Sequence, residues 1–208
     1  IGFDYDDSQL AEHRHPTRQE LDAVSTDVPI MITHQSGHLG VYNSKALAQA
    51  GVTAGSPDPD GGVIHREADG KTPSGLLAEN AHFAALLATL PKFTTQQMMA
   101  MLDSAQRIYV ANGFTTAQDG RTDPRTLSVL PVAAKAGIFK IDVVTYPDLV
   151  SNEKNPLLTG SLMSRTYTDH LRIGGVKLGF DGSPQGKTAW FTQPYFQVPD
   201  GERPDYRG

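Results

Sequence analysis

The clearest periodic pattern in the chain lies at residues 94–112, where apolar side chains recur at intervals of three and four. Met98, Leu102 and Tyr109 share one face of a helix with this spacing. Gly113 follows as a stop signal, since glycine is common just after the last turn of a helix. The pattern predicts a helix over residues 94–112.

Three apolar segments follow this helix, at residues 114–118, 139–146 and 171–180. The first two are separated by a segment that Asp123 can cap, and the last two by a polar connection. Strands separated by helical connections predict parallel pairing with right-handed crossovers, as in an α/β barrel or a doubly wound sheet. Three such strands cannot close a barrel by themselves.

The first part of the chain carries strong local signals for helix ends. Thr17 and Glu20 have the spacing of a capping box, so a short helix begins between them. Asn43 can cap a second helix over residues 44–50, and Gly51 can close it in the left-handed conformation.

Strand signals in the same part predict local, antiparallel pairing. Residues 28–34 form an apolar run of strand length, and residues 63–66 and 75–77 flank a turn as the arms of a hairpin. The sequence therefore predicts a small mixed α/β region at residues 1–92 and a parallel α/β region at residues 93–208.

Composition narrows the class of function. The 208 residues carry a net charge of -5 with acidic and basic residues interspersed, which predicts no nucleic-acid partner and no membrane association. Cysteine is absent, which excludes disulfides and thiolate chemistry but leaves a cytoplasmic or a periplasmic location open. Because the chain starts at Ile1 and not at methionine, we expect it to be a piece of a longer protein.

Polar residues end each of the three predicted parallel strands. Gln118 ends the first, Asp148 follows the second, and Lys177 and Asp181 lie at the end of the third. The carboxyl ends of parallel strands meet at one edge of a sheet, where α/β folds place their sites. We therefore expect these side chains to converge.

Lys177 is unusual because it interrupts a run, residues 176–180, that otherwise resembles a buried strand. Burial favours the neutral amine, which can form a Schiff base, act as a base, or take up carbon dioxide as a carbamate that ligates metals. The alternative is a lysine that points to solvent or pairs with Asp181.

His34 and His38 are four residues apart, the spacing of two metal ligands on one helical face. Gly37 and the preceding strand argue against a helix, so the alternative is a corner where the rings form hydrogen bonds. Glu79 is explained by the dipole of a helix that starts there. The remaining histidines lie among polar residues and are predicted to be on the surface: His13, His15, His65, His82 and His170.

Taken together, several segments resemble the amidohydrolase superfamily of metal-dependent (β/α)8-barrel hydrolases, in its amidohydrolase-3 branch that includes N-substituted formamide deformylases. The segments, which run nearly from end to end of the chain, are residues 16–18, 21–25, 36–38, 43–47, 62–64, 75–79, 113–120, 176–178 and 181–183. The chain departs from the family at residues 33–38, where other members carry an arginine and an aspartate before the Gly-His pair.

The resemblance implies a partial TIM barrel, with strands two to four of the barrel and an insertion over residues 1–92. Lys177 would be the carboxylated ligand of a divalent metal, zinc in this reading, and His38, Gln118 and Asp181 would contact the small-molecule substrate. The other metal ligands and the general base would lie outside the chain, so the 208 residues alone would be inactive and could lack metal.

The function implied is hydrolysis of an amide-like, non-peptide C–N bond by metal-activated water. The alternative is a non-catalytic domain that binds a small molecule or a partner and lacks the metal site. An incomplete barrel also leaves sheet edges open, so we expect that the chain could form a homo-oligomer through them.

Overall fold

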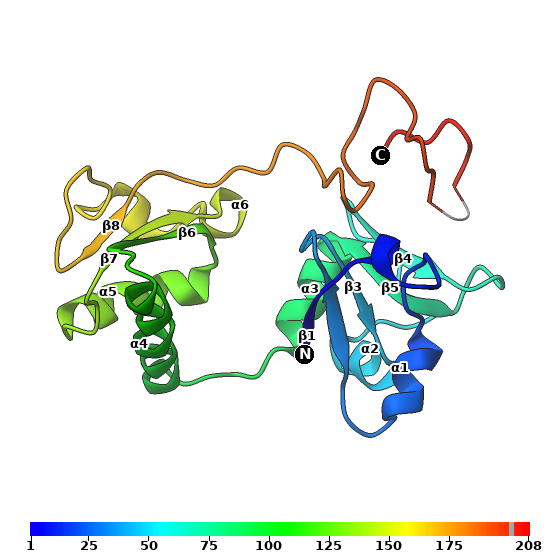
Figure 1. Ribbon diagram of the computed structural model, residues 1–208, viewed down its shortest axis with the longest axis horizontal. Helices are drawn as coiled ribbons and strands as arrows, with labels where there is room; N and C mark the ends of the chain where they lie inside the picture. The colour runs from blue at the N-terminus through cyan, green and yellow to red at the C-terminus, as the bar shows by residue number, and fades with distance from the viewer. Residues whose placement is uncertain (200–201) are drawn as a thin grey trace. The chain divides into compact units, whose positions relative to one another are not determined.

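The computed structural model describes residues 1–199 and 202–208, and these form two compact units. The first unit is Ile1–Pro91 together with Phe180–Gly208, and the second is Lys92–Gly179 (Figure 1). The first boundary lies beside the predicted division at residue 92. The expectation that residues 93–208 form one region is wrong for residues 180–208, because Thr188 bonds to Glu79 and Ser183 is buried in the first unit.

The first unit is built on a five-stranded sheet with the strand order β1-β2-β3-β5-β4. Strand β1 pairs with β2 in parallel, and the other neighbours are antiparallel, so the expected hairpin of β4 and β5 is confirmed. Its elements are β1 (Gly2–Tyr5), the 3-10 helix η1 (Asp7–Gln9), α1 (Arg18–Val24), β2 (Met31–His34), β3 (Leu39–Tyr42), α2 (Ser44–Ala50), β4 (Gly62–Arg66), β5 (Pro73–Glu79) and α3 (Asn80–Thr89).

Both predicted helix caps of the first unit are confirmed. Thr17 accepts a hydrogen bond from the backbone of Glu20, whose side chain bonds back to Thr17, so α1 begins with a complete capping box. Asn43 accepts from Ala46 N at the start of α2, and Gly51 ends the helix with φ 73°. These ends are local features that a few neighbouring residues determine.

The core of the first unit lies between its sheet and the helices α2 and α3. Tyr42 and Leu77 are fully buried there, and Met31 and Ala46 are nearly so. Each fully buried apolar side chain of this size contributes about 1.5–3 kcal/mol of transfer free energy. The unit therefore has a closed apolar interior of its own.

The second unit contains a three-stranded parallel sheet with the order β6-β7-β8, which confirms the predicted parallel pairing. The protein is therefore a mixed α/β protein. The elements of this unit are α4 (Thr95–Ala111), β6 (Thr116–Thr122), α5 (Pro124–Lys135), β7 (Asp142–Pro147), α6 (Leu149–Asn152), the 3-10 helix η2 (Pro156–Thr159) and β8 (Leu171–Ile173).

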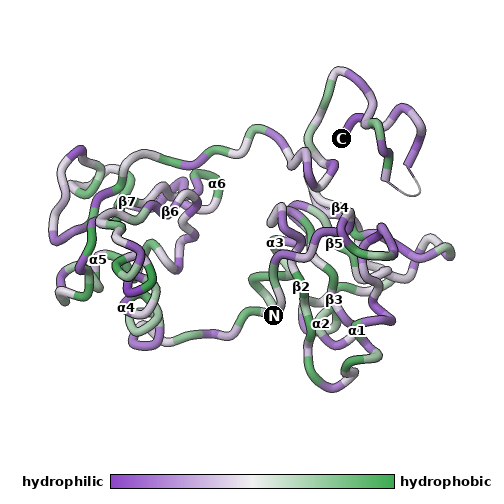
Figure 2. The backbone as a smooth tube through the Cα atoms, in the orientation of Figure 1, coloured by the Kyte–Doolittle hydropathy of each residue, from purple (hydrophilic) through white to green (hydrophobic). Residues whose placement is uncertain are grey.

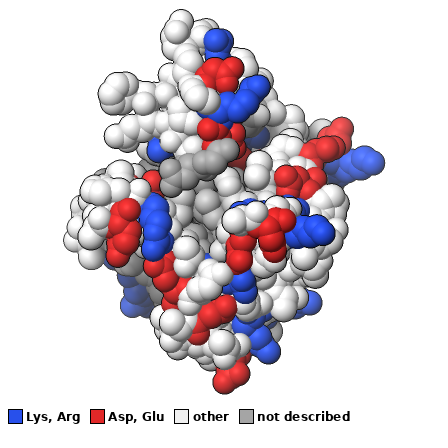
Figure 3. Space-filling model, turned by 90° about the vertical axis from the view of Figure 1, so that its right-hand side faces the viewer, with Lys and Arg blue, Asp and Glu red and all other residues white. Residues whose placement is uncertain are grey.

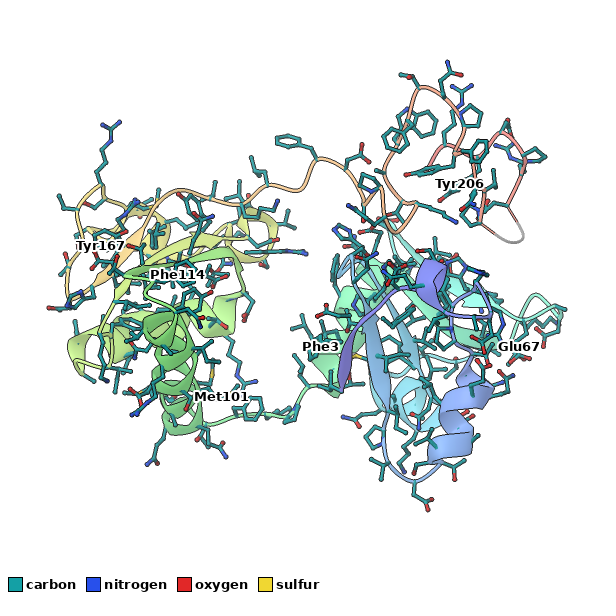
Figure 4. The ribbon with its side chains drawn as sticks, in the orientation of Figure 1. Phe3, Glu67, Met101, Phe114, Tyr167 and Tyr206 are labelled. Atoms are coloured by element: carbon teal, nitrogen blue, oxygen red, sulfur yellow. The ribbon has the colours of Figure 1, made fainter. Side chains whose placement is uncertain are left out.

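The apolar core of the second unit joins α5 to β8, with Leu102 of α4 packed against it. Figure 2 shows hydrophobic and hydrophilic positions alternating along α4 and α5. The strand expected over residues 114–118 begins at Thr116, and the apolar residue before it, Phe114, labelled in Figure 4, is 58% exposed, so this segment is not covered as its apolar character suggested. Strand β6 is an edge of its sheet, and its first residues are open to solvent.

The prediction of a strand over residues 171–180 holds only for residues 171–173 and is wrong for the rest. Strand β8 ends at Ile173 and is followed by Gly174 and Gly175, and beyond them a single bridge joins Lys177 to Asp148. Without a full ladder the segment has no covered face, and Lys177 is exposed. The argument that burial makes this lysine reactive therefore fails for the structure.

No helix within residues 1–199 and 202–208 is both long enough and apolar enough to cross a membrane. Acidic and basic side chains alternate over the face drawn in Figure 3 and form no single-sign patch there. This surface has no broad positive field that would attract a polyanion.

Candidate functional site

Lys177 lies at the carboxyl end of the parallel sheet, where two backbone hydrogen bonds fix its position. Its N–H donates to Pro147 O at 2.8 Å, and its carbonyl accepts from Leu149 N at 3.0 Å. The lysine is thus aligned with the residue that follows β7, although β8 itself has ended. Its ammonium group makes no ion pair with any residue that the structure describes.

Asp148, the residue after β7, is joined to Lys177 by an isolated parallel backbone bridge. Its Oδ2 accepts from Arg121 Nε at 2.9 Å, and its Oδ1 accepts from Ser151 N at 3.1 Å. Burial raises the pKa of Asp148, but the hydrogen bonds from Ser151 and Arg121 outweigh this effect and the pKa is lowered. Asp148 is therefore an ionised group whose two oxygens already have donors.

Gln118 lies on β6 with its side chain exposed, and its Cα is paired with Val144 of β7. The next polar residue, Asp119, accepts from Thr122 Oγ1 at 2.7 Å, and Thr122 in turn contacts Thr145 Oγ1. Thr122 and Thr145 are buried. The predicted convergence at the strand ends thus joins Asp148 to Lys177 through the backbone, while Gln118 forms no hydrogen bond to either within the described residues.

Asp181 belongs to the first unit and Lys177 to the second. The Oδ1 atom of Asp181 accepts hydrogen bonds from Trp190 N at 2.9 Å and Gly182 N at 2.8 Å, and these bonds lower its pKa. The carboxylate therefore holds a loop of its own segment together. It makes no ion pair with Lys177 in the part of the chain that the structure describes.

His34 and His38 each pair with a different carboxylate. His34 Nε2 lies 3.0 Å from Asp7 Oδ1, and its Nδ1 lies 2.8 Å from Ser36 Oγ. His38 Nδ1 lies 2.9 Å from both carboxylate oxygens of Glu79. The expected corner with hydrogen-bonded rings is therefore confirmed: the backbone N–H of Ser36 donates to His34 Nδ1 at 3.2 Å, and side chains supply the other partners.

The structure groups Asp6, Asp7 and His34 closely enough for three ligand atoms to meet, and this is the one such group among the described residues. Asp6 already accepts from Ser8 and Gln9, and Gln35 Nε2 donates to it at 2.8 Å. Its acceptor atoms are thus engaged. The adjacent carboxylates Asp6 and Asp7 are the signal in the sequence that could have drawn attention to this group.

A metal at Lys177 would find an incomplete set of ligands in the second unit. As a carbamate, Lys177 would offer two oxygens, which suits a divalent cation. The oxygens of Asp148 are bonded to Arg121 and Ser151, and Asp142 pairs with His170 Nδ1 at 2.8 Å. Among the described residues of the second unit, Lys177 is therefore the one group in this set that could ligate a metal without losing a hydrogen bond or an ion pair.

Three histidines that the sequence predicted on the surface are partly or fully buried instead: His15, His65 and His82. Burial lowers the pKa of each, to about 4 for His15 and for His82. His82 is fully buried on α3, where Tyr42 Oη lies 2.9 Å from its Nδ1. Polar neighbours in the sequence therefore did not indicate which of these histidines the fold would bury.

A cavity with a volume of about 820 Å³ lies in the first unit. His15, His65, Lys187 and Thr188 are among its lining residues. Lys187 has φ 56° and no ion-pair partner among the described residues. The cavity is lined by residues of both charges, with the cation Lys187 and the carboxylate of Asp7 among them.

The chain matches one protein family and several known proteins. The sequence profile described as the amidohydrolase family matches residues 1–206. The chain is 26% identical over 96% of its length to YtcJ of Bacillus subtilis (strain 168), which is named an amidohydrolase, and 32% identical over 65% of its length to the N-substituted formamide deformylase of Arthrobacter pascens. The chain spans 37% and 26% of these two relatives.

Solved structures agree. A metal-dependent hydrolase from Pyrococcus horikoshii OT3 superposes with a TM-score of 0.60 at 25% identity, over 93% of this chain and 36% of that one. A metal-dependent hydrolase from Pyrococcus furiosus gives a TM-score of 0.56, also at 25% identity, over 93% of this chain and 38% of that one. The chain thus matches about a third of each hydrolase.

Proposed function

The chain belongs to the amidohydrolase family, and from this premise we propose that the protein is a metal-dependent hydrolase acting on a C–N bond other than a peptide bond. The formamide deformylase relative supports the bond type, and the metal-dependent hydrolase structures support the metal. The observation that carries the proposal is Lys177, fixed by two backbone hydrogen bonds at the carboxyl end of a parallel sheet with its ammonium unpaired within the described residues.

The proposed role of Lys177 begins with loss of a proton from its ammonium. The amine nitrogen then forms a bond to the carbon of carbon dioxide and releases a second proton to solvent, which leaves an anionic carbamate. The carbamate oxygens would hold a divalent cation, which we propose to be zinc. Such a cation, when bound, supplies an activated water and polarises a substrate carbonyl. His38, Gln118 and Asp181 are proposed to contact the substrate, and we propose that the fold of the second unit is part of a TIM barrel.

We further propose that the 208 residues alone are inactive, because the carboxylate of Asp148, which is bridged to Lys177, is already bonded to Arg121 and Ser151. The open edge of β6 provides a route to a homo-oligomer. Light scattering measures this directly: a monomer at all concentrations would rule out pairing through the edge.

Metal analysis tests the central proposal. The longest natural form of the protein that contains this chain is compared with its Lys177→Ala variant, and bound metal is measured by atomic emission. We expect one or two divalent ions in the parent and loss of at least one in the variant. Lys154→Ala is the matched control, because Lys154 is an exposed lysine of the same unit.

Labelled bicarbonate provides a second readout. With ¹³C-bicarbonate, the parent should show a carbamate carbon signal by NMR that Lys177→Ala lacks and Lys154→Ala retains. Unchanged metal content in Lys177→Ala would remove Lys177 from the site.

A second candidate function is a binding domain without a metal. The exposure of Lys177 favours it, because an exposed lysine is adequately explained by solvation. Absence of both the metal and the carbamate signal in the parent would support this alternative.

A further inference from the structure

Glu79 has a backbone conformation that side chains other than glycine rarely adopt. Its φ is 51° and its ψ is -125°, at the junction of β5 and α3. Such outliers are unfavourable and persist when the surrounding structure holds them in place; they cluster at functional sites. The dipole of α3 explains a carboxylate near a helix start, but it does not explain why a residue with a Cβ occupies this position.

The carboxylate of Glu79 determines the state of the His38 ring. Both carboxylate oxygens lie 2.9 Å from His38 Nδ1. An ionised carboxylate can only accept, so Nδ1 must carry the proton, and in the neutral ring Nε2 is then a hydrogen-bond acceptor. The ring of Phe83 lies edge-on at 5.9 Å from the His38 ring and further restricts its orientation.

The neighbouring pair of His34 and Asp7 shows what a structural histidine is like in the same turn. His34 is 1% exposed, and both of its ring nitrogens have side-chain partners. The His38 side chain is 30% exposed, and its Nε2 makes no hydrogen bond with a described residue and is open to solvent. One histidine is fully used by the fold, and the other keeps one nitrogen available.

A second contact joins Glu79 to the wall of the cavity in the first unit. Thr188 Oγ1 donates to Glu79 Oε1, and the same hydroxyl accepts from Ser183 N at 2.8 Å. Thr188 lines the cavity of about 820 Å³. The Glu79 carboxylate therefore lies one hydrogen bond away from the cavity wall and is held from two sides.

We propose that Glu79 is a positioning residue that holds His38 as the Nδ1–H tautomer, so that Nε2 accepts a hydrogen bond from the N–H of an amide-like substrate. The inference rests on the proposed hydrolase function for the identity of the substrate. The strained backbone of Glu79 is retained because it aims the carboxylate at His38.

Kinetics of four variants test the proposal with an N-substituted formamide as the probe. By analogy with partners that orient metal-ligating histidines, we expect Glu79→Ala to lower kcat/KM roughly 10–100-fold. His38→Ala should have a similar effect, and Glu79→Ala should cause no further loss when combined with it, because Glu79 acts through His38. Glu67→Gln is the matched control, since Glu67 pairs with Arg18 in the same unit, and it should leave kcat/KM unchanged.

Two readouts do not depend on turnover. By ¹⁵N NMR the parent should show His38 protonated at Nδ1, and Glu79→Ala should lose this preference. Glu79→Gly should melt at a higher temperature than Glu79→Ala, because glycine adopts positive φ without strain. Both variants lack the carboxylate, so both should lose the same activity although one is the more stable.

The proposal and the hydrolase function fail in different ways. If the parent hydrolyses the probe but Glu79→Ala keeps full kcat/KM, or if Glu79→Ala reduces activity equally in the parent and in His38→Ala, the positioning role is overturned. An unchanged His38 tautomer in Glu79→Ala overturns it even in a protein with no measurable turnover. A parent with no bound metal and no turnover contradicts the hydrolase function instead.

Discussion

The two compact units are built on different sheets, although each has an apolar core of its own. In the first unit Tyr42 and Leu77 are 0% exposed in a core between a five-stranded sheet and its helices, while Phe3 is 68% exposed. In the second unit Leu171 is 0% exposed in a core beside a three-stranded sheet, while Ile108 is 67% exposed. Both units therefore leave some large apolar side chains open to solvent, and they differ in the sheet and in how their candidate site residues are held.

The candidate site residues follow the same division. His38 is oriented by Glu79, by Phe83 and, through Glu79, by Thr188. Lys177 is fixed by its backbone alone, and its side chain is exposed. Side-chain contacts therefore preorganise the His38 ring, whereas at Lys177 only the backbone position is fixed.

The largest effect that separates the units is expected from truncating an apolar residue in each. Leu77→Ala should lower the free energy of unfolding of the first unit by about 2–5 kcal/mol, because it leaves a cavity in a packed core. Phe114→Ala should change that of the second unit by about 0.5 kcal/mol or less, since its ring is mostly exposed.

Chemical denaturation followed by hydrogen–deuterium exchange measures both effects, because exchange reports on each unit separately. Equal losses in the two variants would show that Phe114 is covered in solution and would remove the contrast between the units.

A smaller effect is expected from pH, and it should act on the first unit. Burial lowers the pKa of His82 from 6.5 to about 4, so between these values the unfolded chain binds more protons than the folded chain. Stability should therefore fall as the pH drops from 6.5 to 4 and level off below. The difference corresponds to about 3 kcal/mol for this group.

The variant His82→Gln cannot titrate, so its stability should depend less steeply on pH in this window than that of the parent. His170→Gln is the control, because the His170 side chain is 55% exposed in the second unit. Parallel pH profiles for the parent and His82→Gln, measured by denaturant unfolding, would refute the assignment.

The smallest effect should be the same in both units. Thr17 and Thr94 each begin a helix with a complete capping box, on α1 and α4. Replacement of either by alanine should cost about 1 kcal/mol, because the lost hydrogen bonds are local. Circular dichroism during thermal unfolding gives the two values, and a large difference between them would mean that tertiary contacts decide these helix ends.

Local chemistry explains which predictions from the sequence were confirmed. Helix α2 begins at the Asn43 side chain and ends at the left-handed backbone of Gly51, and both residues act within one turn of the helix. The parallel order of β6, β7 and β8 follows from the helical connections between them. The family assignment came from short segments in a fixed order, which the match over residues 1–206 confirms.

What the sequence could not show was which side chains would be covered. Lys177 was predicted inside a buried strand, yet the ladder of β8 ends at Ile173 and leaves the lysine exposed. His82 was predicted on the surface, yet α3 packs it beside Tyr42 under the sheet. Burial depends on elements that are distant in the sequence, so a local pattern of apolar residues cannot determine it.

By itself the sequence determined the helix ends, the parallel strands, the α/β class and the family, since each depends on neighbouring residues or on their order. Tertiary structure alone decided that Glu79 meets His38, and that Thr188 reaches the same carboxylate from 109 residues away. A carboxylate acquires its role from the groups that folding brings within hydrogen-bonding distance. That is why the sequence attributed Glu79 to a helix dipole and the structure gives it a partner.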